Sequence, residues 1–216
     1  MKRLIVYDLD GTLADTLQDI TYAANAMLHD FRLPAVSTDQ VRSYVGRGMR
    51  ELVKNCLGNV EPEQVDQAMA VYRSYYGKHM LDTTKLFPGV RKLLEHFSSH
   101  RQAVITNKPD PYASQVVQAL GLSGFFIEVI AGDGEFPKKP DPTALRTLMR
   151  RLDVIPEHTV FVGDSTVDVF TGRNAGVVTV AVCHGFDSRS DLEAAGPDAL
   201  VDDFAQLLEL AKVHSW

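Results

Sequence analysis

Two carboxylates stand one residue apart near the start of the chain. Asp8 and Asp10 directly follow the apolar run Leu4–Tyr7. Alternate side chains of an extended segment point the same way, so both carboxylates can face one edge of a sheet. One can attack phosphorus as a nucleophile, while the other can protonate the leaving oxygen and later take a proton from water. Gly11 permits a tight turn whose backbone N–H groups can hold phosphate oxygens. Aspartates also cap helices, so this run alone leaves a structural role open.

Later polar residues complete this chemistry. Thr106 and Asn107 follow a second apolar run, and Lys139 precedes a proline-braced turn. Asp164 follows a third apolar run, and Asp168 lies one helical turn beyond it. Phosphoryl transfer demands in-line positioning and neutralised oxygen charge, which a hydroxyl, an ammonium group and a metal ion can supply. The aspartate pair suits Mg²⁺, which prefers oxygen ligands and needs only one or two carboxylates. Each group alone could be a cap or a solvated side chain, but the combination favours a magnesium-dependent phosphatase.

Short apolar runs that alternate with helical patterns must position these groups. Most of the runs are nearly continuous in apolar residues, as expected for strands buried on both faces of a parallel sheet. Alternation of strands and helices predicts a doubly wound α/β sheet, whose functional groups lie outside the carboxyl ends of the strands. The predicted strands are Leu4–Tyr7, Ala103–Ile105, Ile127–Ile130, Val160–Val162, Val177–Val182 and a short edge strand, Ala199–Val201.

One long stretch interrupts this alternation. Between about residues 15 and 86 only helical patterns occur, and Ser37 with Gln40 forms a candidate capping box within it. Some 70 residues are too many for one crossover between neighbouring strands. We therefore predict an all-helical cap domain over residues 15–86, inserted into an α/β catalytic core made of residues 1–14 and 87–216.

The motifs resemble those of the haloacid dehalogenase-like superfamily, in order and spacing, across nearly the whole chain. The segments that carry the resemblance are Asp8–Thr12, Thr106–Asn107, Lys139–Pro140 and Gly163–Ser165 with Asp168. The resemblance implies a Rossmann-like core, a nucleophilic Asp8 and an acid/base Asp10. A dehalogenase is disfavoured, because dehalogenases of this superfamily lack an aspartate at the position of Asp10.

The resemblance also implies the ligand-binding residues. Thr106 and Lys139 would bind phosphate, and we expect Asn107 and Gly11 to bind it as well. Mg²⁺ would be held by Asp8, the Asp10 carbonyl oxygen and Asp164, with Asp168 close behind or bridged through water.

A loop in the predicted cap resembles that of phosphoglycolate phosphatases. It spans Val45–Leu52, and the segment Thr106–Pro109 is similar to the second motif of the same subfamily. Gly46 and Gly48 would let backbone approach a ligand, and Arg47 could grip a substrate carboxylate, as could a second arginine in the loop. A surface loop with solvated arginines is the alternative. We expect Arg47 to recognise the end of the substrate that carries no phosphate.

Composition limits the function classes. The chain has 216 residues and a formal net charge of −6, which argues against a nucleic-acid partner. No apolar run approaches 18 residues, so no membrane span is expected, and two distant cysteines form no zinc pattern. We expect a cytoplasmic monomer or homodimer that acts on a small phosphorylated metabolite.

The preferred function is hydrolysis of a small phosphate monoester through an aspartyl-phosphate, with 2-phosphoglycolate as the first choice of substrate. A β-phosphoglucomutase-like mutase and a pyrophosphatase of the same superfamily are alternatives. A phospho-receiver signalling domain is an alternative of another class, although it needs neither the second aspartate nor a cap.

Overall fold

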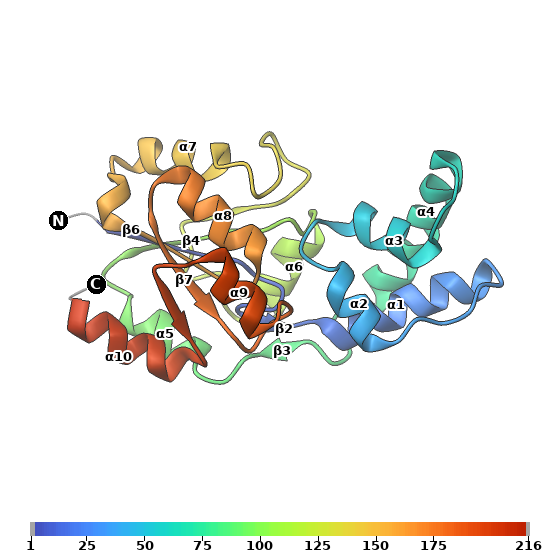
Figure 1. Ribbon diagram of the computed structural model, residues 1–216, viewed down its shortest axis with the longest axis horizontal. Helices are drawn as coiled ribbons and strands as arrows, with labels where there is room; N and C mark the ends of the chain where they lie inside the picture. Colours follow the sequence, from blue (N-terminus) through green and yellow to red (C-terminus); the bar gives the residue numbers. More distant parts are fainter. Residues whose placement is uncertain (1–2, 215–216) are drawn as a thin grey trace.

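A six-stranded, all-parallel sheet forms the centre of the molecule (Figure 1). The computed structural model describes residues 3–214. The strand order is β5-β4-β1-β6-β7-β8, so the chain reverses direction across the sheet at β1. This arrangement confirms the predicted doubly wound α/β fold, with small shifts of the strand ends. The strands are β1 (Leu4–Tyr7), β4 (Arg101–Ile105), β5 (Glu128–Ile130), β6 (Thr159–Gly163), β7 (Val178–Val182) and β8 (Ala199–Val201).

The two faces of β1 bury different sets of side chains. Ile5 and Tyr7 pack into one apolar cluster with helices α5, α6 and α10, whereas Leu4 and Val6 pack into another with α7 and α8. Because every residue of β1 is buried, its sequence is a continuous apolar run rather than an alternating one. The helices are α5 (Val90–His96), α6 (Tyr112–Ala119), α7 (Thr143–Leu152), α8 (Thr166–Ala175), α9 (Arg189–Ala195) and α10 (Phe204–His214).

Four helices between the first and second strands of the large sheet lie together at one end of it, at the right of Figure 1. We call them the helical insert: α1 (Leu17–Asp30), α2 (Thr38–Tyr44), α3 (Met49–Leu57) and α4 (Pro62–His79). The predicted capping box is confirmed, because the Ser37 hydroxyl accepts from the Gln40 N–H while the Gln40 side chain accepts from the Ser37 N–H. The insert shares one buried apolar cluster with the α5 and α6 side of the sheet. The division into two domains at residues 15 and 86 stays a prediction.

The two chain segments that join the insert to the sheet lie side by side. They pair as a short antiparallel ribbon of β2 (Ala14–Asp15) and β3 (Lys85–Leu86). Just beyond it, the buried Asp19 carboxylate accepts hydrogen bonds from the backbone N–H and hydroxyl groups of both Thr83 and Thr84, at 2.7–3.1 Å. Five hydrogen bonds to one carboxylate therefore tie the start of α1 to the returning strand.

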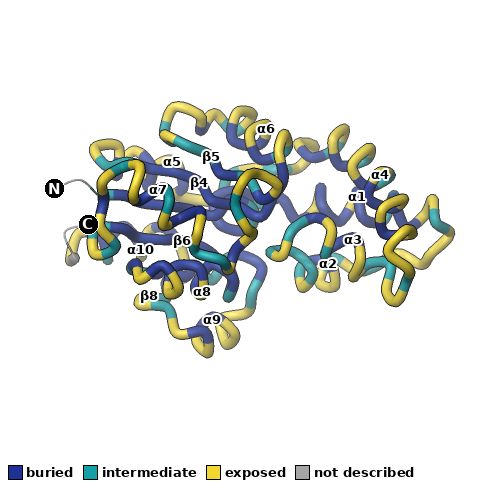
Figure 2. Tube along the Cα trace, turned by 90° about the horizontal axis from the view of Figure 1, so that it is seen from above, coloured by how far each residue is buried: buried dark blue, intermediate teal, exposed yellow. Residues whose placement is uncertain are grey.

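Burial follows the sheet (Figure 2). The strands and the helix faces turned toward them are buried, whereas the outer turns of the insert are exposed. Within residues 3–214, no helix is long and apolar enough to cross a membrane.

Candidate active site

Asp8 lies buried at the carboxyl end of β1, between a lysine and two further carboxylates. Lys139 Nζ lies 2.8 Å from Asp8 Oδ1 and 2.6 Å from Asp168 Oδ1. Burial raises the pKa of Asp8 to about 6, although Lys139 opposes this shift. Burial would lower the pKa of Lys139, but Asp168 and Asp8 outweigh it and hold that pKa above its ordinary value. The lysine is therefore a permanent cation beside a carboxylate that shares its space with other negative charges.

Asp164 and Asp168 are held in place by groups of the core. Thr12 Oγ1 donates to Asp164 Oδ1 at 2.6 Å, and the Phe186 N–H donates to the other oxygen at 2.8 Å. Asp168 closes a capping box at the start of α8, where its Oδ2 accepts from the N–H and hydroxyl of Ser165. Burial and the neighbouring carboxylates, Asp168 and then Asp8, raise the pKa of Asp164, although the Thr12 and Phe186 hydrogen bonds oppose this.

These three carboxylates could hold a metal ion. One oxygen of each of Asp8, Asp164 and Asp168 lies within 4.8 Å of the others. Asp8 Oδ1 is buried without a hydrogen bond of good geometry among the described residues, even though Lys139 Nζ is near it. A buried carboxylate oxygen that lacks a donor fits a hard cation. Asp168 fits direct ligation less well, since its two oxygens already accept from Lys139 and Ser165.

Gly11 lies where the turn after β1 passes closest to this cluster. Its φ of +81° is in the left-handed region that favours glycine. A Cβ atom there would collide with the Asp164 carboxylate and the Phe186 ring. The glycine predicted to free backbone N–H groups for phosphate thus also lets the first turn pack against Asp164.

Asp10 has a lysine partner that the sequence did not predict. Lys108 Nζ donates to both carboxylate oxygens of Asp10, at 2.9 and 3.0 Å, and also to the hydroxyl oxygen of Tyr76 on α4. Lys108 stands two residues after Thr106, just as Asp10 stands two residues after Asp8. The alternation used for the two aspartates could therefore have indicated that Lys108 and Thr106 share an edge.

The side chain of Asn107 bonds within the protein, while its role in binding phosphate stays a prediction. Its Nδ2 donates to the carbonyl oxygens of Gly46 and Lys139, and its Oδ1 accepts from the Lys139 N–H. These bonds occupy the amide, so the backbone N–H is the group of Asn107 that could bind phosphate. Thr106 is buried beside it, and its hydroxyl accepts from the Lys108 N–H at 3.2 Å. Asn107 thus connects the insert loop to the Lys139 turn.

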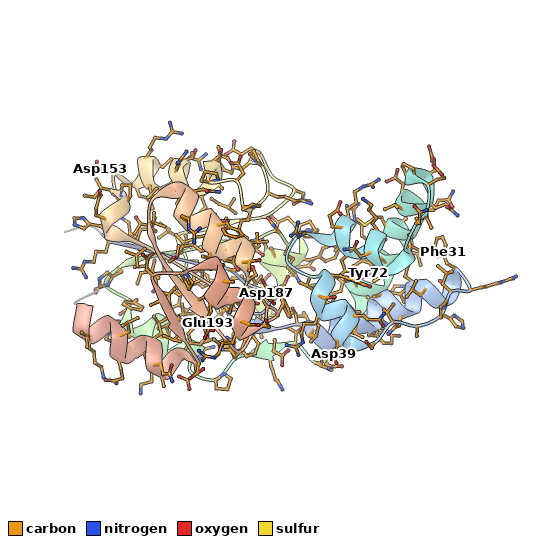
Figure 3. The ribbon with its side chains drawn as sticks, in the orientation of Figure 1. Phe31, Asp39, Tyr72, Asp153, Asp187 and Glu193 are labelled. Carbon is orange, nitrogen blue, oxygen red and sulfur yellow. The ribbon has the colours of Figure 1, made fainter. Side chains whose placement is uncertain are left out.

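A cavity opens between the sheet edge and the insert. Its empty space, counting the part open to solvent, is about 480 Å³. Figure 3 labels Tyr72, which lines this cavity from the insert, and Asp187, on the core. The insert wall is our name for the apolar and aromatic residues that line it from that side: Ile20, Val45, Met49, Leu52, Tyr72 and Tyr76.

The predicted specificity loop is only partly in this cavity. Gly46 and Gly48 line it, but Arg47 between them is exposed and is absent from its lining. Arg50 points away as well and pairs with Asp66 on α4. The physical reason is that water solvates the Arg47 side chain and Asp66 pairs with that of Arg50. The side of the loop that faces the cavity consists of glycine backbone and apolar side chains.

A second link between insert and core was also not predicted. Arg42 of α2 donates to the Gly185 carbonyl oxygen at 2.8 Å. Gly185 begins the loop that holds Asp164 through the Phe186 N–H, and Asp187 in the same loop accepts from the Thr166 N–H at the start of α8. This loop therefore braces the acidic cluster of the site.

Comparison with known proteins gives one consistent result. Residues 5–182 match the family described as haloacid dehalogenase-like hydrolase. A phosphoglycolate phosphatase of Vibrio vulnificus strain YJ016 is 33% identical over 222 residues, covering 99% of this chain and 97% of that protein. A phosphoglycolate phosphatase of Pseudomonas putida is 34% identical, covering 96% of this chain and 79% of that protein.

Solved structures agree with the sequence comparison. The crystal structure of a predicted phosphoglycolate phosphatase from Haemophilus somnus superposes with a TM-score of 0.91 at 28% identity, covering 97% of this chain and 98% of that chain. A haloacid dehalogenase-like family protein from Streptococcus pneumoniae gives a TM-score of 0.88 at 25% identity, with the same coverage.

Proposed function

Since this chain belongs to the haloacid dehalogenase-like hydrolases, we propose that it is a magnesium-dependent phosphatase of small phosphate monoesters, with 2-phosphoglycolate as its substrate. The observation that carries the proposal is the buried Asp8 Oδ1, which faces Lys139 and lacks a hydrogen bond of good geometry. A nucleophile needs a lone pair that no hydrogen bond occupies, and a cation beside it offsets its repulsion by a phosphate dianion.

The first half-reaction transfers the phosphoryl group to the protein. An Asp8 oxygen attacks phosphorus, forming the new P–O bond as the bond to the ester oxygen breaks in line with it. Asp10, two residues on and at the same edge, donates a proton to the departing alkoxide. Lys139 and the Thr106 hydroxyl hold the phosphoryl oxygens during this step.

The second half-reaction restores Asp8. A water molecule gives a proton to Asp10 as its oxygen attacks phosphorus, and the P–O bond to Asp8 breaks to release inorganic phosphate. The insert wall covers this edge and keeps bulk water away. Asp10 therefore serves as acid in the first step and as base in the second.

Magnesium fits the acidic cluster. The proposed ligands are Asp8, the Asp10 carbonyl oxygen and Asp164, with Asp168 behind them as the partner of Lys139. When bound, the ion would neutralise phosphoryl oxygen charge. A site with three buried carboxylates against one lysine has the surplus negative charge that such an ion requires.

A screen of phosphate release over small phosphate esters, with Mg²⁺ or with EDTA, tests the proposal. We expect the highest kcat/KM for 2-phosphoglycolate, and loss of turnover in EDTA that Mg²⁺ reverses. Pyrophosphate ranking first would assign the pyrophosphatase alternative, and a sugar phosphate isomerised without release of phosphate would assign the mutase. The family match leaves no support for the phospho-receiver alternative. The oligomeric state and a cytoplasmic location stay predictions.

A further inference from the structure

Each aspartate of the first run has its own lysine. Lys139 Nζ lies 2.8 Å from Asp8, and Lys108 Nζ lies 2.9 and 3.0 Å from the two oxygens of Asp10. In the proposed reaction Asp8 faces phosphorus and Asp10 faces the leaving oxygen. Lys139 therefore lies at the phosphate end of a bound ester and Lys108 at the leaving-group end.

The leaving-group end of the cavity offers little else that could bind a charge. Among the lining residues that the structure describes, Lys108 alone carries a cationic side chain. The insert wall opposite is apolar except for its two tyrosines, and Arg47 is exposed outside the cavity. A desolvated anion is stable only where donors or opposite charge meet it, so any charge on the leaving group must lie at Lys108.

Two phenol groups stand beside this lysine. The Tyr76 oxygen accepts from Lys108 Nζ, which leaves its own O–H proton free to donate. Tyr72 stacks on Tyr76 with ring centroids 5.6 Å apart, and it lines the same cavity. Burial raises the pKa of both phenols, so both stay protonated donors near neutral pH.

We propose that Lys108, Tyr76 and Tyr72 form an anion subsite that binds an acid group on the leaving alcohol. The inference rests on the proposed function and assigns the residues that would recognise the acid group of its substrate. Because Lys108 Nζ lies within 3.0 Å of Asp10, which must reach the ester oxygen, the acid group stands one or two carbons from that oxygen. The substrates are therefore 2-phosphooxy carboxylates and their close analogues.

The subsite also explains how Lys108 can serve two partners. An ammonium group has three donors, of which two point to Asp10 and one to Tyr76 in this structure. When one Asp10 oxygen turns to the leaving oxygen of the ester, the donor that it had accepted becomes free for the acid group. The acid group of the substrate then accepts the hydrogen bond that one Asp10 oxygen has released, so all three donors of the Lys108 ammonium group stay paired.

The test compares two esters that differ only in charge: 2-phosphoglycolate and its primary amide, 2-phosphooxyacetamide. Wild type, Lys108→Met, Tyr76→Phe and Lys54→Met are assayed for kcat and KM with Mg²⁺. Lys54→Met is the matched control, since Lys54 is an exposed lysine of α3 outside the cavity lining. Thermal unfolding of each variant checks that it folds.

Wild type is expected to prefer the acid. Lys108→Met should reduce the acid-to-amide ratio of kcat/KM by about 10- to 100-fold, the size of a lost charge-assisted hydrogen bond, with most of the loss in KM for the acid. Tyr76→Phe should reduce the ratio by about 3- to 10-fold, and it tests the subsite even if Lys108→Met fails to fold. Lys54→Met should leave the ratio unchanged.

An equal loss on both esters in Lys108→Met and Tyr76→Phe would assign these groups to Asp10 alone and overturn the subsite. Wild-type protein that releases phosphate from neither ester would instead overturn the proposed function.

Discussion

The two walls of the cavity are built on opposite principles. The sheet edge, formed by the loops after β1, β4 and β6, holds buried ionised groups in a network of short contacts, such as Lys139 between Asp8 and Asp168. The insert wall is largely apolar, and the loop arginines beside it, Arg47 and Arg50, point to solvent or to a surface carboxylate. On the proposed function, the sheet edge carries the chemistry, whereas the insert selects the leaving group mainly by shape and by a few hydroxyl donors.

The largest effect should come from removing the nucleophile on the sheet edge. Asp8→Asn is expected to lower kcat by at least about 10³-fold, because an amide oxygen cannot form the aspartyl-phosphate. Phosphate release from 2-phosphoglycolate with Mg²⁺ measures it, and unfolding in urea shows that the variant is folded. Retention of a tenth of wild-type kcat would show that Asp8 is not the nucleophile.

Next in size is the loss of the cation from the same wall. Lys139→Met should destabilise the protein by about 3–5 kcal/mol, because Asp8 and Asp168 stay buried without their partner. Urea unfolding without Mg²⁺ measures this loss, with the exposed neighbour Lys138→Met as the matched control. A loss below 1 kcal/mol would show that the ionised groups of the sheet edge are solvated rather than buried.

The free energy of unfolding should depend on pH because Asp8 is buried. Burial raises the pKa of Asp8 to about 6, against about 3.9 in an unfolded chain. Protonated Asp8 therefore favours the folded state at low pH, and this contribution is lost as pH rises from about 4 to 6. Without Mg²⁺, Asp8→Asn should gain about 2 kcal/mol over wild type between pH 4.5 and 7.5. A constant difference in the urea-unfolding free energies would show that the folded protein leaves the pKa of Asp8 at its ordinary value.

A smaller effect is expected where the insert joins the core. Asp19→Ala removes the acceptor of five hydrogen bonds from Thr83 and Thr84. Because Thr83 is exposed and water can replace part of this network, we expect a loss of about 2 kcal/mol in urea unfolding. Asp82→Ala, in the exposed loop that precedes these threonines, serves as the control and should lose less than 1 kcal/mol.

The smallest effect should come from the loop arginine of the insert. Arg47→Ala is expected to change the acid-to-amide ratio of kcat/KM by less than about twofold, since an exposed side chain outside the cavity gains little from a bound acid. The two-ester assay measures it beside Lys108→Met. A tenfold change would restore the role that the sequence predicts for Arg47 and would move charge recognition to the insert.

Much of the sheet edge could be predicted from the sequence. Asp8, Thr106 and Asp164 each follow a buried apolar run, and the carboxyl ends of parallel strands meet at one edge whatever the details of packing. The runs themselves are readable because a strand buried on both faces must be apolar throughout. The hydrophobic periodicity and the order of the strands along the chain were enough to predict that these residues lie at one edge.

The contacts across the cavity could not be predicted in this way. Lys108 meets Tyr76, Asn107 meets Gly46, and Arg42 meets Gly185, each pair joining the insert to the core. The partners in these pairs lie 32 to 143 residues apart, and no local period relates them. These contacts form only when the insert packs against the sheet in one orientation, and that orientation depends on the shapes of the two packed surfaces.

Residue types placed at the ends of buried strands were thus enough to predict the reaction chemistry. The packed fold was needed to show that Lys108 rather than Arg47 lies within the cavity, and that burial among carboxylates raises the pKa of Asp8. The physical reason is range. Strand and helix periods act over a few residues, whereas desolvation and the pairing of buried charges depend on everything that packs around a group.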